Sequence, residues 1–209
     1  MSTKRVRRVV VMCAVAGLIA AVATPAHAST AVHSRFKGRQ AIATYSRVSG
    51  CIETDAIVIA QKGLSRNGTG TPTRQTNVRL EVFAFNFCTE TDISDAFGTA
   101  VISDSAFTIG RSLTSAHLDA TVGVTDVVST ESYNVHVTMT WSGTGLTSTT
   151  KNHFRSKVGD STFMETFHGT TRDAQANGSI TRGMTTLISG TADFANLGDF
   201  TDSTLELTR

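Results

Sequence analysis

Apolar and polar residues alternate along most of this chain. The clearest stretches are 77–87, 116–126 and 133–141, where an apolar side chain recurs at every second position. This period of two, together with many Val, Thr and aromatic residues, predicts β-strands that bury one face. Only 172–177 comes near a helical pattern, and it is short enough to be part of a strand that ends at Gly178. We therefore expect an all-β fold.

Turn residues divide the alternating stretches at regular intervals. Gly-containing turns lie near residues 49–50, 67–70, 142–145, 158–160 and 177–178. The strands between them are predicted at 36–48, 51–62, 77–88, 93–102, 106–110, 115–127, 133–141, 147–157, 161–170 and 172–182, with a short last one near 203–208. The pattern predicts an antiparallel β-sandwich of about ten strands, with a flattened β-barrel as the alternative.

The N-terminal segment has the pattern of a secretory leader. Four basic residues precede an apolar run at 9–23, and Ala26-His27-Ala28 follows it. These features predict a signal peptide, residues 1–28, that is cleaved between Ala28 and Ser29. The alternative is an uncleaved membrane anchor, for which the apolar run is short. We expect a secreted, extracellular protein with one all-β domain, residues 29–209, and no membrane span after cleavage.

Removing the leader changes the charge of the protein. Four of its 19 basic residues lie in the leader, so 15 basic residues face 17 acidic ones and the net charge becomes −2. The basic residues form no run in the sequence, so we expect neither a basic face nor a nucleic-acid partner. The 181 residues that follow the leader suit a monomer with one sizeable core.

Two cysteines, Cys51 and Cys88, follow the leader. In an exported chain this count predicts one disulfide, with two buried free thiols as the alternative. The midpoint between the cysteines falls in the turn at 67–70, which predicts an antiparallel hairpin with Cys51 directly opposite Cys88. In that register Ile52 would face Phe87 and Thr54 would face Phe85, so that small residues oppose large ones.

Each cysteine begins a similar acidic stretch, CIETD at 51–55 and CTETD at 88–92. A parallel pairing would stack Glu53 on Glu90 and Asp55 on Asp92, which requires a cation such as calcium between them. The antiparallel hairpin separates the two pairs instead. We therefore interpret these acids as part of a solvated strand face.

Catalytic candidates are few. His153 and His168 lie on neighbouring predicted strands, and with Glu165 or Asp160 they form the best acid–base group that the sequence offers. Ordinary surface histidines are the simpler interpretation. No nucleophile motif and no phosphate-binding loop is present in the sequence, and we expect no cofactor.

Two further groups suggest ligand binding. Asp193, Asp199 and Asp202 lie close together in the sequence and resemble an oxygen-rich calcium loop, although their spacing fits a polar connection equally well. Three aromatic residues, Tyr45, Tyr133 and Trp141, are able to stack on a sugar. Their alternating register favours a place in the core.

Four stretches carry a resemblance to a known group of proteins. They are 45–55 (YSRVSGCIETD), 85–91 (FNFCTET), 115–126 (SAHLDATVGVTD) and 141–145 (WSGTG). In these stretches the chain resembles small secreted proteins of uncharacterised function that occur chiefly in actinobacteria. The resemblance implies bacterial secretion and an all-β domain, and it implies no catalytic residue.

Together these observations favour a non-enzymatic extracellular module that binds a ligand, with a glycan or a cell surface as the candidates. One alternative is a small secreted hydrolase that uses His153 and His168 with a nearby carboxylate. The other is a structural protein of the cell envelope. An enzyme needs a concave pocket with convergent catalytic groups, whereas a binding module needs an exposed patch of distinctive chemistry.

Overall fold

The computed structural model describes residues 32–158 and 161–208, and all regular structure in these ranges is β-strand. The predicted leader and its cleavage site, Ala28 and Ser29, lie outside the described residues. Within the described ranges no helical segment has the length and hydropathy that a membrane crossing requires. The strands are β1 (Val32–Ser49), β2 (Ile52–Asn67), β3 (Thr73–Asn86), β4 (Thr91–Val101), β5 (Phe107–Ile109), β6 (Ser115–Asp126), β7 (Ser132–Gly143), β8 (Ser148–Val158), β9 (Ser161–Arg182), β10 (Thr185–Thr191) and β11 (Phe194–Thr208).

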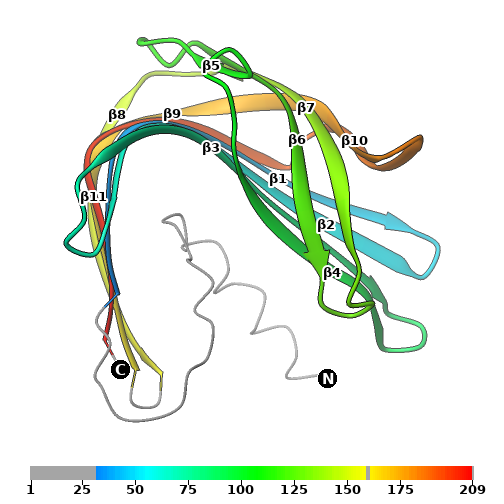
Figure 1. Cartoon of the computed structure of the whole chain (residues 1–209). Helices are drawn as coiled ribbons and strands as arrows, with labels where there is room; N and C mark the ends of the chain where they lie inside the picture. The colour runs from blue at the N-terminus through cyan, green and yellow to red at the C-terminus, as the bar shows by residue number, and fades with distance from the viewer. Residues whose placement is uncertain (1–31, 159–160, 209) are drawn as a thin grey trace.

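All these strands belong to one antiparallel sheet that folds over on itself (Figure 1). Its main order is β10-β9-β11-β1-β2-β3-β4-β6-β5. β7 pairs with β6 on one side and with residues 174–181 of β9 on the other, so that the chain of pairings returns to β9. The all-β, antiparallel prediction is therefore confirmed, and the two packed layers are parts of one continuous sheet.

The hydrophobic core lies where β6 and β7 cross over β1, β2 and β3. Every second residue of β6 is buried, from Ala116 to Val124, as the sequence pattern predicts. Trp141 of β7 is 1% exposed, and its indole Nε1 donates a hydrogen bond of 2.8 Å to the carbonyl oxygen of Ile42 in β1. Burial of a large apolar side chain stabilises a fold by about 1.5–3 kcal/mol, so these alternating residues hold the two layers together.

The sheet continues beyond this core as a curved extension that we call the arm (Figure 1). The arm consists of β8 together with residues 161–172 of β9, 199–208 of β11, 32–39 of β1, 62–67 of β2 and 73–76 of β3. Long strands make this possible, because β1 has 18 residues and β9 has 22. The same strands therefore run through the core and out into the arm.

A row of glycines crosses the sheet where the arm begins. Gly169 of β9, Phe200 of β11, Gly38 of β1 and Gly63 of β2 pair in succession. A Cβ atom on Gly63 would overlap the carbonyl oxygen of Lys37, and one on Gly169 would lie 2.9 Å from the Cα of Phe200. A β-bulge between Phe200 and Asp202 adds local twist at the same place. We call this row the glycine crease, because small residues there allow the sheet to bend sharply.

The cysteines are bridged, but the register of the hairpin differs by one residue from the prediction. The disulfide Cys51–Cys88 has a Cα–Cα distance of 5.5 Å and closes the antiparallel β2–β3 hairpin. Ile52 faces Asn86, not Phe87, and Thr54 faces Ala84, not Phe85. The predicted register would place Val58 opposite Glu81, whereas the observed one pairs Val58 with Leu80, and both are fully buried. Core burial therefore sets the register, and the disulfide joins two cysteines that are one residue away from being directly opposite in that register.

Three strand predictions were wrong near the C-terminus. The strands predicted at 161–170 and 172–182 form one strand, β9, which has partners along both edges. β10 was missed, and β11 begins at Phe194, not near residue 203. The stretch before 203 is rich in small and polar residues, but Ala195 and Leu197 alternate into the core. Tertiary pairing thus makes a strand from a sequence typical of a polar connection.

Candidate functional site

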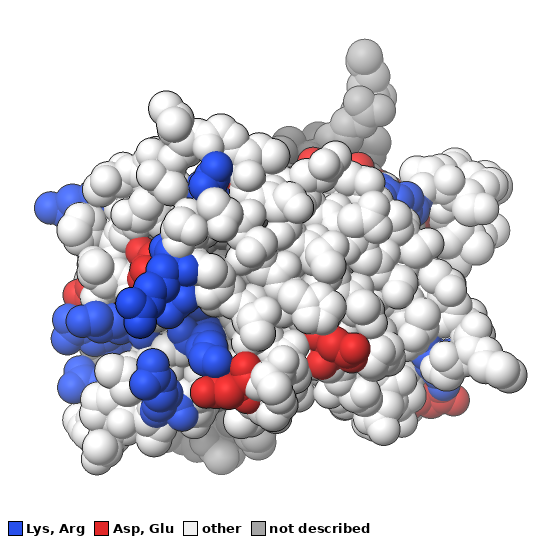
Figure 2. Space-filling model, turned by 90° about the horizontal axis from the view of Figure 1, so that it is seen from above, with Lys and Arg blue, Asp and Glu red and all other residues white. Residues whose placement is uncertain are grey.

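The outward face of the arm carries most of the cations in the protein (Figure 2). On β1, β2 and β3 its side chains have the same parity as the core residues Ala41, Ala60 and Val78. In the core region β6 and β7 cover this side of the sheet, whereas in the arm the same positions are exposed or half-buried, apart from the buried Thr76. We call it the basic face, and it consists of Arg35, Lys37, Arg39, Lys62, Arg66, Arg74, Arg111, Lys151, Arg155 and Arg172, which are ten of the 15 basic residues after residue 28.

Strand pairing brings these cations into rows. Arg39 of β1 faces Lys62 of β2, and Arg35 faces Arg66 in the same way. Lys37 faces Leu64, which in turn faces Arg74 of β3. Because directly opposed residues in a sheet lie about 5 Å apart, the positive charges reinforce one another across three strands.

Only part of this charge is neutralised within the protein. Asp202 forms a two-pronged ion pair with Arg35, with an Nε–Oδ1 distance of 2.7 Å. Asp104 lies 3.4 Å from the ammonium of Lys62. A hydrogen bond from the Thr76 hydroxyl, together with Lys62 and Arg74, lowers the pKa of Asp104 and keeps it ionised. The other eight cations make no ion pair with another described residue: Lys37, Arg39, Arg66, Arg74, Arg111, Lys151, Arg155 and Arg172.

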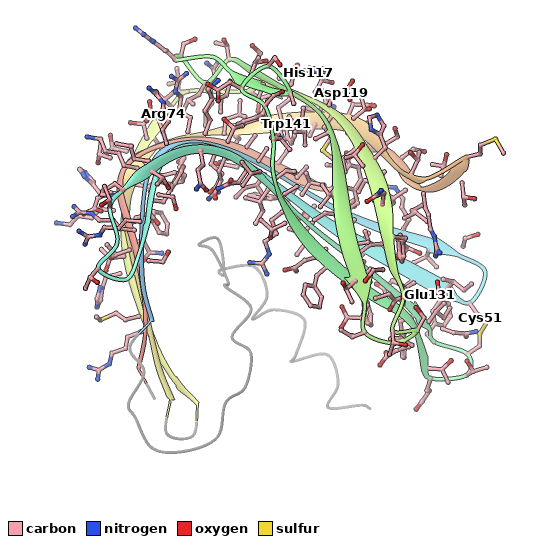
Figure 3. The ribbon with its side chains drawn as sticks, in the orientation of Figure 1. Cys51, Arg74, His117, Asp119, Glu131 and Trp141 are labelled. Atoms are coloured by element: carbon pink, nitrogen blue, oxygen red, sulfur yellow. A yellow bond between two sulfur atoms is a disulfide. The ribbon has the colours of Figure 1, made fainter. Side chains whose placement is uncertain are left out.

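Acidic residues gather at the opposite, disulfide end of the molecule. Figure 3 labels Arg74 on the arm and Cys51 at the far end of the fold. Around the β2–β4 ends lie Glu53, Asp55, Glu81, Glu90, Asp92, Asp95 and Asp126. Burial raises the pKa of Asp95, and the charges of Glu81, Asp126 and Asp92 raise it further. Cations thus gather at one end of the molecule and acids at the other, and our expectation that no basic face exists was wrong.

The two candidate catalytic histidines lie on the basic face. Thr166 pairs with His153 of β8, and Lys151 pairs with His168 of β9, so the histidines are diagonal neighbours. His153 Nδ1 lies 2.8 Å from the Thr166 hydroxyl, and His168 Nδ1 lies 3.2 Å from the Thr201 hydroxyl. The side chain of Glu165 and the whole of Asp160 lie outside the described residues. Both described contacts are therefore to threonine and not to a carboxylate.

The three C-terminal aspartates do not come together. Asp193 accepts a hydrogen bond of 2.6 Å from the backbone N–H of Ser46 and pairs with Arg47. Asp202 pairs with Arg35, while Asp199 lines a separate pocket. In the part of the chain that the structure describes, no group of three or more His, Cys, Asp or Glu residues has the arrangement of a metal site.

The aromatic candidates for sugar stacking belong to the core or are covered. Trp141 is buried, as described above, and Tyr45 is 3% exposed. Tyr133 is half-buried, and the guanidinium of Arg182 lies 3.8 Å from the centre of its ring. The core interpretation of Trp141 and Tyr45 is therefore confirmed.

A pocket of about 580 Å³ lies at the edge of the basic face, where the arm meets the core region. Thr170 and Arg172 of β9 and Asp199 and Thr201 of β11 form its floor. Two connections form its walls, residues 111–113 before β6 and residues 145–147 before β8. Cationic, anionic and hydroxyl groups thus converge in one hollow.

The sequence contains a signal for the basic face that we did not use. Arg35, Lys37 and Arg39 recur with a period of two, as do Lys62 and Arg66 with Leu64 between them. Alternation places such residues on one side of a strand, so a basic stripe was predictable for each strand alone. The pairing of the stripes was not predictable, because it depends on the strand order.

Comparison of this chain with family models, with curated proteins and with solved structures finds no match.

Proposed function

We propose that this protein is a secreted, non-enzymatic binding module that holds an anionic glycan of a cell surface on its basic face. The observation that carries the proposal is the clustering of ten cations on one side of the arm, while acidic residues gather at the opposite end of the molecule. Such a face concentrates polyanions and orients the molecule toward them. The leader pattern, the disulfide and the resemblance to secreted actinobacterial proteins support an extracellular location.

The composition of the basic face favours a glycan over a single-stranded nucleic acid. Proteins that bind single strands usually interleave aromatic side chains with cations, so that bases can stack. Among the described residues of this face there is no Phe, Tyr or Trp, and the cations lie beside hydroxyl groups such as those of Thr166 and Thr170. Hydroxyl groups and cations together match the hydroxyl and acid groups of an anionic polysaccharide.

The test is binding of dextran sulfate, with neutral dextran of equal length as the comparison. We expect the protein to bind dextran sulfate with an affinity that falls steeply as salt is raised. The K37Q/R74Q/K151Q variant removes three exposed cations from the basic face. It should weaken binding by at least tenfold and reduce the slope of log Kd against log salt by about 2–3, roughly one per lost contact.

The matched control is R47Q/R79Q/R182Q, which changes the net charge equally at positions outside the basic face. It should change the affinity less than twofold once its thermal melt confirms that it is folded. Equal losses in the two variants would mean that only net charge matters, and absence of binding by the natural protein would overturn the proposal. A clear preference for a single-stranded oligonucleotide over dextran sulfate would also overturn it.

A further inference from the structure

We infer that the pocket at the edge of the basic face recognises a single uronic acid residue of the bound polymer. This inference rests on the proposed function, because it names the sugar that the binding module would select. A volume of about 580 Å³ lies within the range of pockets that hold small molecules. The pocket also opens onto the basic face, since Arg172 belongs to both.

Arg172 supplies the site for the acid group. Its side chain packs over Gly143, where an added Cβ would lie 2.9 Å from the Arg172 Cδ atom, so the missing side chain at Gly143 makes room for it. Its Nη1 lies 3.4 Å from the carbonyl oxygen of Ser112, which is a weak contact. Its Nε is buried and has no hydrogen-bond partner among the described residues. The Nη2 group makes no hydrogen bond with a described residue, so the guanidinium keeps donors for a carboxylate, and Arg111 on the facing connection adds a second positive charge.

Asp199 determines what kind of anion fits. Asp199 lies directly opposite Thr170 on the floor of the pocket, beside the hydroxyl of Thr201. A carboxylate in this position repels a bare or doubly charged anion such as a phosphate. It accepts hydrogen bonds from the hydroxyl groups of a sugar, and the threonine hydroxyls can complete that set. The combination therefore favours a ring that carries both hydroxyl groups and one negative charge, which describes a uronic acid.

The test compares three soluble probes by calorimetry: trigalacturonate, neutral galactotriose and inorganic tripolyphosphate. We expect the natural protein to bind trigalacturonate at least tenfold more tightly than galactotriose. The D199N variant should bind trigalacturonate at least tenfold more weakly, because the amide is a poorer acceptor for sugar hydroxyls. The same variant should bind tripolyphosphate more tightly, by about twofold or more, because a repelling charge is removed.

If D199N weakens the binding of trigalacturonate and strengthens the binding of tripolyphosphate, its effect cannot come from the change of charge alone. D173N is the charge-matched control, since Asp173 is exposed on β9 and does not line the pocket. It should leave trigalacturonate binding within twofold. The R172K variant keeps the charge but loses the planar guanidinium with its paired donors. It should weaken the binding of trigalacturonate at least fivefold and the binding of dextran sulfate less than twofold.

Each other result has a definite meaning. If D199N strengthens the binding of trigalacturonate as well as tripolyphosphate, the pocket acts only through charge and the inference is overturned. Equal affinity for galactotriose and trigalacturonate would overturn it too. Dextran sulfate binding without trigalacturonate binding would overturn the inference and leave the proposed function standing, whereas failure to bind dextran sulfate would overturn the proposed function itself.

Discussion

The carboxylate of Asp126, at the end of β6, accepts hydrogen bonds from residues of β4. Its side chain accepts hydrogen bonds from the Ser94 hydroxyl at 2.9 Å, from the Asp95 N–H at 3.1 Å and from the Val128 N–H at 3.0 Å. Burial by itself raises the pKa of Asp126, but these hydrogen bonds and one from the Ser129 N–H outweigh it and lower the pKa to about 2. β4 and β6 share only two residue pairs, so the hydrogen bonds to this carboxylate are a substantial addition to the contact between the two strands.

Replacing Asp126 with Asn should therefore destabilise the fold in a pH-dependent way. The amide keeps one acceptor oxygen, but its NH₂ group faces N–H and O–H groups that donate to Asp126. We therefore expect the free energy of unfolding to fall by about 1–3 kcal/mol near neutral pH. The pKa in the folded state lies below the ordinary value of 3.8, so the stabilisation is complete above pH 4 and disappears as the pH falls through 2. Chemical unfolding at several pH values should show the two proteins converging between pH 4 and pH 2.

Asp119→Asn is the control for this measurement, because Asp119 is an exposed carboxylate of the neighbouring part of β6. It should change stability by less than about 0.5 kcal/mol. A difference between Asp126→Asn and the natural protein that does not vary with pH would contradict the assignment.

At the scale of elements, the β2–β3 hairpin is held at both of its ends. The turn at residues 68–72 closes one end, and the disulfide closes the other beside a hydrogen bond of 3.0 Å from the Phe87 N–H to the Cys51 carbonyl oxygen. The bridged residues are separated by 37 positions. On the chain-entropy model, a disulfide that closes a loop of this length stabilises the folded protein by roughly 3–4 kcal/mol.

We expect the variant Cys51→Ser/Cys88→Ser to fold but to melt at a clearly lower temperature, because the core residues of the hairpin are unchanged. Thermal melts of the natural protein with and without a reducing agent provide the control. The reduced natural protein should melt close to the double variant. An unchanged melting temperature in the double variant would mean that the bridge lies outside the cooperative unit.

At the scale of the whole molecule, the glycine crease determines where the basic face points. The crease lies between the closed core region and the arm, and the long strands bend there (Figure 1). No charged group belongs to the crease. A change in the crease therefore alters the shape of the arm without altering its charge.

Gly63→Ala should distort the arm, because the added Cβ would overlap the backbone of Lys37 in the adjacent strand. We expect a lower melting temperature, a changed radius of gyration in solution scattering, and binding of dextran sulfate weakened at least threefold. Gly123→Ala is the matched control, since its Cβ would meet only the Asn134 side chain at an ordinary 3.6 Å. Unchanged shape and stability in Gly63→Ala would show that the crease does not set the bend.

Local patterns in the sequence were sufficient for much of the fold. The alternation in β6 and β7 predicts both the strands and their buried faces, because a side chain's direction in a strand depends only on its position. The two cysteines and the turn at 67–70 predict the hairpin and its disulfide. These features depend on neighbours in sequence and on one short connection.

The hairpin register, the strands near the C-terminus and the basic face depend on the packing of distant parts of the chain. The hairpin register shifts by one residue because Val58 must pair with Leu80 in the core, and β10 and the start of β11 become strands only because β9 and β1 pair with them. The basic face forms because β6 and β7 cover the inner halves of β1, β2 and β3 and leave the outer halves open. Each strand carries its cations at alternate positions by sequence alone, but only the packing of distant strands determines which stretch of each stripe reaches solvent and which stripes lie side by side.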